Sequence, residues 1–165
     1  MKARSTLLAA AVGLATLSLN AHADPSAWTA DAPRASAPAV DRSGQARHGK
    51  ASWYGRGFIG KPMADGTPMD PTSNNAASRT LPLGTTAKVT NLDNGRSAVV
   101  EIRDRGPYVD GRIVDVSPHT AEKLGLTQRG VAPVVVAPIE VPQGDGSVKP
   151  GVAATAGAAL EASSQ

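Results

Sequence analysis

The chain has 165 residues and a formal net charge of +3 at pH 7, a length that leaves room for one domain with flanking segments. It has no cysteine, which excludes a disulfide scaffold and a thiolate metal site. Lysine and arginine are spread along the chain and aromatic residues make up only 3% of it, so the sequence does not indicate a nucleic-acid-binding protein.

Residues 1–23 are typical of a cleavable secretory signal peptide. Lys2 and Arg4 precede an apolar run over residues 7–19, and residues 21–23 have the small-x-small pattern of a cleavage site. The run is short for a bilayer-spanning helix, so a retained anchor is the less favoured alternative. Loss of the two basic residues with the signal would leave a net charge of +1. We expect a secreted protein without a lipid anchor, because no cysteine follows the cleavage site.

Composition separates a folded unit from two flanking segments. Residues 24–47 are rich in Ala, Ser, Pro and Asp without apolar periodicity, which predicts a disordered linker. Residues 143–165 are rich in Gly, Ala and Ser, which predicts a disordered tail. The folded unit is therefore predicted to cover residues 48–142, as a single domain with a modest core.

The folded unit has a mainly β pattern. Ala87 and Val89 alternate with polar neighbours, and Asn94-Gly95 supplies a turn before the next alternating segment, which together predict a hairpin. Short strands are predicted over residues 50–54, 86–91, 97–103, 112–116 and 131–141. Short strands joined by Gly and Pro turns predict a closed barrel.

One helix and one long loop interrupt the strands. Ser117 is typical of an N-cap, and Pro118 is typical of the first position of a helix. Gly125 is typical of a helix end, so a short helix is predicted between them. Residues 60–82 lack apolar periodicity and are rich in Pro. A loop of that length in a small domain is usually functional, so we expect it on the active face.

Two aromatic side chains are candidates for binding. Trp53 and Tyr54, beside Gly55, offer an aromatic platform for the apolar face of a sugar ring. The alternative is that both belong to the core.

Two aspartates outside regular strands are candidates for chemistry. Asp70 is held extended by Pro71, so it either points a carboxylate into a cleft or accepts hydrogen bonds in an Asx-turn. Asp104 lies between Arg103 and Arg105, whose charges favour the carboxylate form, whereas burial would favour a proton donor. The alternative for Asp104 is a structural network that holds the turn.

A third aspartate, Asp115, lies inside an apolar strand, where an acid is seldom left unpaired. Arg103 and Arg105 are its candidate partners, and a structural role is favoured for it.

The sequence does not indicate other chemistries. It has no G-x-S-x-G, phosphate-cradling Gly loop or H-E-x-x-H motif. His48 and His119 are isolated, which predicts neither a catalytic triad nor a zinc site. We expect no metal and no cofactor.

Five segments together resemble the rare lipoprotein A (RlpA) family of double-psi β-barrel proteins. In chain order the segments are GKASWYG, ADGTPMD, RTLPLGT, VTNLDNGRSAVVEIRDRGPY and GRIVDVSPHTAEKLGL. Their order and spacing match those of the family. The resemblance covers about residues 48–141. It implies a mainly β fold, a single six-stranded double-psi β-barrel with one or two short helices, and a groove across one face. It also implies action on peptidoglycan in the periplasm, often at the division septum.

The resemblance also implies an activity. Characterised members are lytic transglycosylases, which cleave the bond between N-acetylmuramic acid and N-acetylglucosamine and leave a 1,6-anhydro end. Active members usually carry a Glu three residues before the loop Asp and a His eight residues after it. Counted from Asp70, these positions hold Thr67 and Ser78, whose hydroxyls are not acids at neutral pH.

The leading hypothesis is an endolytic peptidoglycan lytic transglycosylase that acts in cell-wall remodelling and daughter-cell separation. Asp104 is the predicted acid and Asp70 the second carboxylate, in one shared cleft. The predicted substrate-binding residues are Trp53, Tyr54, Arg79, Arg105, Tyr108 and Asp115.

Two alternatives stay open. The replacements at Thr67 and Ser78 favour a non-catalytic barrel that binds peptidoglycan. A third hypothesis is an envelope protein that makes only protein contacts. The expected partners are glycan strands, with divisome proteins as further candidates, and the expected state is a monomer.

Overall fold

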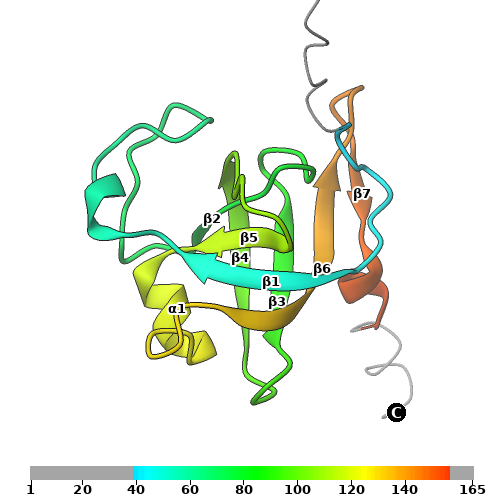
Figure 1. Ribbon diagram of the computed structural model, residues 1–165. Coiled ribbons are helices and arrows are strands. Elements are labelled where there is room, and N and C mark those ends of the chain that lie inside the picture. The colour runs from blue at the N-terminus through cyan, green and yellow to red at the C-terminus, as the bar shows by residue number, and fades with distance from the viewer. Residues whose placement is uncertain (1–38, 157–165) are drawn as a thin grey trace, which may run out of the picture. The chain divides into compact units, whose positions relative to one another are not determined.

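The computed structural model describes residues 39–156 (Figure 1). Its strands are β1 (Arg47–Trp53), β2 (Asn75–Ala77), β3 (Thr86–Asn91), β4 (Ser97–Asp104), β5 (Arg112–Val116), β6 (Ala132–Pro142) and β7 (Val148–Pro150). Its helices are the 3-10 turn η2 (Arg56–Phe58) and α1 (Pro118–Leu124), and residues 152–156 form a further helical turn.

Six of the strands close into a barrel. Their order is β1-β5-β2-β4-β3-β6, and β6 pairs back onto β1 to complete the ring. The pairs β1–β5 and β2–β4 are parallel, whereas the other pairs are antiparallel. The expected fold, a mainly β, single six-stranded double-psi β-barrel with one or two short helices, is therefore confirmed.

The alternating strands place their apolar faces inside the barrel. Ala87 and Val89 of β3 are fully buried, as are Val100 and Ile102 of β4, while Lys88 between the first two is exposed. The predicted hairpin is confirmed, because β3 and β4 pair in antiparallel register. A side-chain period of two gives each strand one core face, and this fixes its register.

The helix α1 begins and ends where its capping residues predict. The Ser117 side chain accepts a hydrogen bond from the Thr120 backbone N–H at 3.2 Å. Gly125 has a φ of 72°, the left-handed conformation that ends many helices, and its N–H bonds back to the last turn. Buried Leu124 and Leu126 attach this end of the helix to the core.

The prediction of one long loop over residues 60–82 is partly wrong. Asn75–Ala77 forms β2, which lies between β4 and β5 and closes the barrel on that side. All three residues of β2 are buried, so the strand has no polar–apolar alternation by which the sequence could reveal it. The rest of the segment is held by an isolated bridge between Pro62 and Pro68.

The prediction of a disordered tail is wrong for residues 143–156. Strand β7 pairs with β6 there, and the Gly151 backbone N–H donates to Ile139 O at 2.8 Å. The predicted linker is also too long, because β1 begins at Arg47 and the Asp41 N–H donates to Thr80 O at 2.7 Å. These contacts add residues from both flanks to the barrel domain.

The predicted signal peptide, residues 1–23, lies outside the described residues, as do residues 24–38 of the predicted linker and 157–165 of the predicted tail. Within residues 39–156, no helix has the length and apolar character needed to cross a membrane.

Candidate functional site

A cleft of about 390 Å³ opens at the ends of β1 and β4, beside β5. Six of the predicted site residues line it: Trp53, Tyr54, Asp104, Arg105, Tyr108 and Asp115. The structure adds Phe58, Ala77, Val109 and Arg112, together with Gly and Pro residues of the two loops. Aromatic side chains therefore meet two carboxylates in one depression.

The two carboxylates of the cleft are Asp104 and Asp115. Both residues are cross-strand neighbours of Ala77 in β2, Asp104 through the parallel pairing with β4 and Asp115 through the antiparallel pairing with β5. Their backbones are thus two strand spacings apart, roughly 10 Å. The small side chain of Ala77 lies between them and leaves the floor of the cleft open.

Three hydrogen-bond donors converge on Asp104. Its Oδ1 accepts from the backbone N–H groups of Ala64 at 2.9 Å and Arg105 at 2.8 Å, and its Oδ2 accepts from the Tyr54 hydroxyl at 3.1 Å. Burial, followed by the negative charge of Asp104, raises the pKa of Tyr54, so this phenol stays protonated and can donate. An acid that only accepts hydrogen bonds is suited to the carboxylate form.

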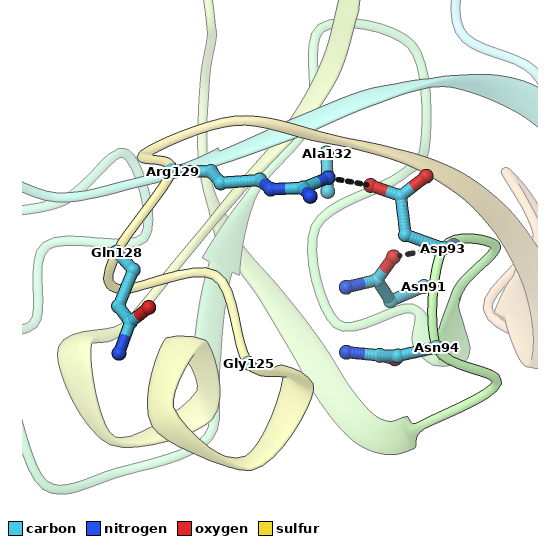
Figure 2. A pocket seen from close by; sticks show the side chains of 7 residues that line it. All are labelled: Asn91, Asp93, Asn94, Gly125, Gln128, Arg129 and Ala132. Carbon is cyan, nitrogen blue, oxygen red and sulfur yellow. Dashed lines mark hydrogen bonds and ion pairs between the residues drawn. The ribbon is translucent and has the colours of Figure 1, made fainter.

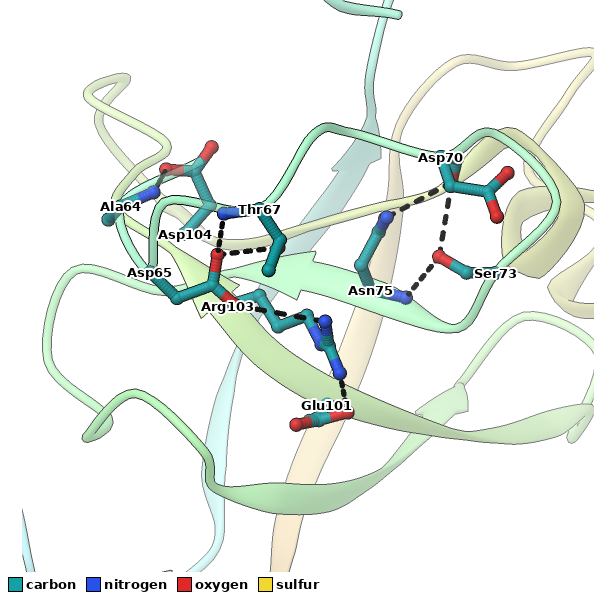
Figure 3. A network of polar contacts seen from close by, with 9 residues as sticks. All are labelled: Ala64, Asp65, Thr67, Asp70, Ser73, Asn75, Glu101, Arg103 and Asp104. Carbon is teal, nitrogen blue, oxygen red and sulfur yellow. Dashed lines mark hydrogen bonds and ion pairs between the residues drawn. The ribbon is translucent and has the colours of Figure 1, made fainter. Parts of the chain in front are cut away.

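The flanking arginines do not pair with Asp104. Arg103 forms ion pairs with Glu101 at 3.1 Å and Asp65 at 3.8 Å (Figure 3). Arg105 donates from its guanidinium to the carbonyl oxygens of Ser78 and Leu81. The prediction that these two guanidinium groups surround Asp104 is wrong, because strand geometry directs adjacent side chains to opposite faces.

Asp115 has other partners than those predicted. Ser52 donates a hydrogen bond to Asp115 Oδ1, and Arg112 donates to Ser52 Oγ at 3.1 Å. Arg103 and Arg105 do not bond to it. Burial raises the pKa of the Asp115 carboxyl, the Ser52 hydrogen bond and the Arg112 charge oppose that rise, and the Asp104 charge adds to it. The net effect is a pKa of Asp115 above that of an ordinary aspartate.

The aromatic residues of the cleft differ in exposure, and Trp53 is half-buried, with its side chain packed against the core. Tyr54 is only 5% exposed and packs with Met63, Met69 and Ala77, so the alternative of a core position holds for its ring. Phe58 and Tyr108 are 54% and 75% exposed. These two rings form an accessible apolar surface on the walls of the cleft.

Asp70 is not brought into the cleft. Its Oδ1 accepts hydrogen bonds from the Thr72 backbone N–H at 2.8 Å and the Thr72 hydroxyl at 2.7 Å, which is the Asx-turn alternative. The same two bonds hold the pKa of Asp70 below its usual range. Figure 3 shows Asp70 and Asp104 at opposite ends of the loop network. The prediction that they share a cleft is wrong. Arg79 also lies outside the cleft lining.

Thr67 and Ser78 have structural roles in the loop. The Thr67 hydroxyl donates to Asp65 Oδ1 at 2.6 Å. Ser78 is buried, and its hydroxyl oxygen accepts from the Leu81 backbone N–H at 3.3 Å. Both hydroxyls therefore stabilise turns, and neither residue lines the cleft.

A second depression lies at the far end of α1, next to the β3–β4 turn (Figure 2). The amides of Asn91 and Asn94 both donate to Leu124 O, at 2.9 and 3.0 Å. Arg129 pairs with Asp93 at 3.2 Å. The two asparagine amides are already bonded to the end of the helix, and Arg129 is already paired with Asp93. The cleft with Asp104 and Asp115 is therefore the better candidate site.

Sequence reasoning missed Phe58, Arg112 and the function of Ser52. Phe58 follows Gly55 and Gly57 in a turn, and a large aromatic residue in such a glycine-rich turn is a signal of a surface role. No local signal marks Ser52 and Arg112, because the hydrogen bonds from Arg112 to Ser52 and from Ser52 to Asp115 cross between β5 and β1 and form only when these strands pair. Among residues 39–156, no cluster of three or more His, Asp or Glu side chains has the geometry of a metal site.

A family model described as lytic transglycolase matches residues 46–136, which is the barrel from β1 into β6. The chain belongs to this family. The match includes the cleft residues from Ser52 to Asp115, and the double-psi barrel is the fold implied by the RlpA resemblance.

Curated relatives carry the same family assignment in their names. "Endolytic peptidoglycan transglycosylase RlpA" of Vibrio cholerae is 50% identical over 93 residues, which is 56% of this chain and 35% of the relative. A probable RlpA of Nostoc is 52% identical over 88 residues, covering 52% of this chain and 24% of that protein. The chain thus spans about a third or less of the length of these relatives.

Solved structures are similar at lower identity. The Streptomyces papain inhibitor has a TM-score of 0.46 and 28% identity, with 59% of this chain and 96% of that chain covered. The Clavibacter michiganensis expansin has a TM-score of 0.45 and 22% identity, with 60% and 52% covered.

Proposed function

We propose that this domain is an endolytic peptidoglycan lytic transglycosylase that cleaves the bond between N-acetylmuramic acid and N-acetylglucosamine and leaves 1,6-anhydro ends. The observation that carries the proposal is that one aromatic-walled cleft holds both Asp115, whose pKa is raised by burial, and the hydrogen-bonded carboxylate Asp104. Two acids with different environments are what acid catalysis of glycosidic cleavage requires. The names of the relatives support the same activity.

Asp115 is the general acid in this mechanism. Its proton passes to the glycosidic oxygen, and the bond between that oxygen and C1 of the muramic acid breaks with its electron pair leaving on the N-acetylglucosamine. The 6-hydroxyl of the muramic acid then bonds to C1 and returns its proton to the Asp115 carboxylate. The acid is regenerated, and neither water nor an enzyme nucleophile is consumed.

Asp104 stabilises the positive charge that develops at C1. Its carboxylate is held by Ala64, Arg105 and Tyr54, so it is oriented before the reaction begins. A charge fixed in advance stabilises a transition state without a reorganisation cost at the moment of reaction. The sequence prediction made Asp104 the acid and Asp70 the second carboxylate. Here Asp115 is the acid and Asp104 is the second carboxylate.

The exposed aromatic walls bind the sugar rings. Phe58 and Tyr108 present apolar faces to the cleft, and pyranose rings stack on such faces through their C–H groups. The Tyr54 ring is buried and serves to position Asp104.

The setting of this activity is also part of the proposal. The signal peptide expected at residues 1–23 would deliver the protein to the periplasm, where the glycan strands of peptidoglycan are its partners. A role in cell-wall remodelling and daughter-cell separation follows from that substrate, with divisome proteins as candidate partners of a monomer.

The test is product analysis. The secreted chain is incubated with sacculi and with amidase-stripped glycan strands, and mass spectrometry detects 1,6-anhydromuramic ends. We expect products from the natural chain, loss of products in Asp104→Asn and Asp115→Asn, and no loss in Asp145→Asn, a matched exchange at an exposed turn. If the natural chain forms no product but co-sediments with sacculi, the enzyme proposal fails and the peptidoglycan-binding barrel replaces it.

A further inference from the structure

A chain of hydrogen bonds crosses from β5 to β1 and back at the cleft. The Arg112 guanidinium donates to Ser52 Oγ at 3.1 Å, and the Ser52 hydroxyl donates to Asp115 Oδ1. Ser52 is only 4% exposed, in a strand whose neighbouring core positions are apolar. A buried hydroxyl thus lies between a permanent cation and an acid of the cleft.

Arg112 fixes the donor–acceptor direction of these hydrogen bonds. An arginine guanidinium has donors and no acceptor, and it stays charged throughout the ordinary pH range. Ser52 Oγ must therefore accept from Arg112, which leaves its single proton for Asp115. While Ser52 donates to Asp115 Oδ1, that oxygen is an acceptor, so a proton on the carboxyl group is carried by Oδ2.

The other carboxyl oxygen is in a different position. Asp115 lines the cleft, and its Oδ2 makes no hydrogen bond within the described part of the chain. Among residues 39–156, the enclosed side-chain oxygens without a partner are Asn75 Oδ1 and Thr85 Oγ1, so Asp115 Oδ2 is reached by solvent. A proton carried by Asp115 therefore belongs on Oδ2, where a ligand in the cleft can meet it.

We propose that Ser52 is a positioning residue that confines the acid proton of Asp115 to Oδ2, the oxygen that opens on the cleft. This inference rests on the proposed function, in which Asp115 is the acid. Without Ser52 the carboxyl group could place its proton on either oxygen and rotate, so a smaller fraction of molecules would present the proton to the glycosidic oxygen.

Other charged and titratable groups face Asp115 from three strands. Arg112 acts from β5, Asp104 from β4, and the Tyr54 phenol from the end of β1. None of them bonds to Asp115 directly in the described structure, so Ser52 is the group that distinguishes its two oxygens.

The first test needs neither a variant nor activity. In labelled full-length protein, NMR follows the Asp115 carboxyl carbon and the Ser52 Cβ as the pH is lowered. We expect the Ser52 side chain to keep one rotamer through the Asp115 titration, because it donates to both protonation states. A Ser52 side chain that reorients in step with the protonation of Asp115 would overturn the proposal.

Variants provide the second test. Ser52→Ala should raise the pKa of Asp115 further, since a hydrogen bond to the ionised form is lost, and should lower kcat by roughly tenfold or more with little change in KM. Ser52→Thr keeps the hydroxyl and should restore both values. Thr85→Val, which removes a buried hydroxyl outside the cleft, should change neither.

The outcomes separate this inference from the proposed function. If the natural chain forms no anhydro products but the NMR behaviour is as expected, the proposed function fails and the proton assignment stands. If products form and Ser52→Ala leaves both the Asp115 titration and kcat unchanged, the positioning role of Ser52 is wrong.

Discussion

The hydroxyl of Tyr54 donates a hydrogen bond to Asp104 Oδ2 across 3.1 Å. This contact joins the end of β1 to the end of β4, fifty positions apart in the sequence. Because the tyrosine ring is buried beside Met63 and Met69, its hydroxyl is held in one place. A buried aromatic residue thereby orients a carboxylate of the cleft.

Replacement of Tyr54 by phenylalanine tests this relationship. Tyr54→Phe keeps the buried ring and removes the donor, so we expect a loss of about 1–2 kcal/mol in the free energy of unfolding and a fall of roughly tenfold in kcat. Denaturant unfolding and product formation measure the two effects. In combination with Asp104→Asn the losses should be strongly non-additive, and simple additivity would mean that the two side chains act independently.

The pH dependence of activity follows from Asp115. Burial raises the pKa of this carboxyl, with the Asp104 charge acting in the same direction. The proposed acid works in its protonated form, so turnover should fall as the pH rises through the raised pKa. Rates measured from acidic to neutral pH should show that limb. A rate that rises instead across the same window would contradict the acid assignment.

The stability of the fold should also depend on the protonation of Asp115, and it should decrease as the pH rises. The folded pKa of Asp115 lies above its unfolded value, so the folded state binds the proton more tightly and loses stability as the pH rises through the raised pKa. Asp115→Asn removes this titration. The variant should therefore show a smaller decrease in melting temperature than the natural chain over that window, as measured by thermal unfolding at a series of pH values.

Much of the barrel could be predicted from the sequence, because several strands alternate clearly. The pattern of Ala87 and Val89 follows from one face in the core and one in solvent, and α1 has explicit caps at Ser117 and Gly125. Strand β2 lacks that signal, since its three residues are all buried. Strand β7 has only three residues, and Gly and Pro lie around it in the sequence, so no strand pattern marks it.

The site was harder to predict than the fold, for a physical reason. Asp104 and Asp115 could be named as unusual acids, but their partners come from other strands. Tyr54 and Ser52 reach them only after β1 pairs with β5 and the barrel closes. By contrast, the Asx-turn of Asp70 is a local structure, and the sequence raised it as an alternative.

The attachment of the C-terminal segment can be tested at Gly151. A Cβ atom at this position would lie 2.2 Å from Pro138 O, a backbone atom that cannot move without disturbing β6. We expect Gly151→Ala to lower the free energy of unfolding by about 1–3 kcal/mol. Gly144→Ala is the matched control, because a Cβ there meets no atom within 4 Å. Equal stability of the two variants would show that residues after β6 do not belong to the domain.

The proposed catalytic pair is Asp104 and Asp115, and it excludes Asp70. The most direct measurement is kcat for 1,6-anhydro product formation by three matched variants, Asp104→Asn, Asp115→Asn and Asp70→Asn, each checked for folding by circular dichroism. We expect the first two variants to lose about a hundredfold or more in kcat. Asp70→Asn should keep a rate within a few fold of the natural chain, since it disturbs only an exposed turn. Loss of activity in Asp70→Asn with activity retained in Asp115→Asn would show that the proposed pair is wrong.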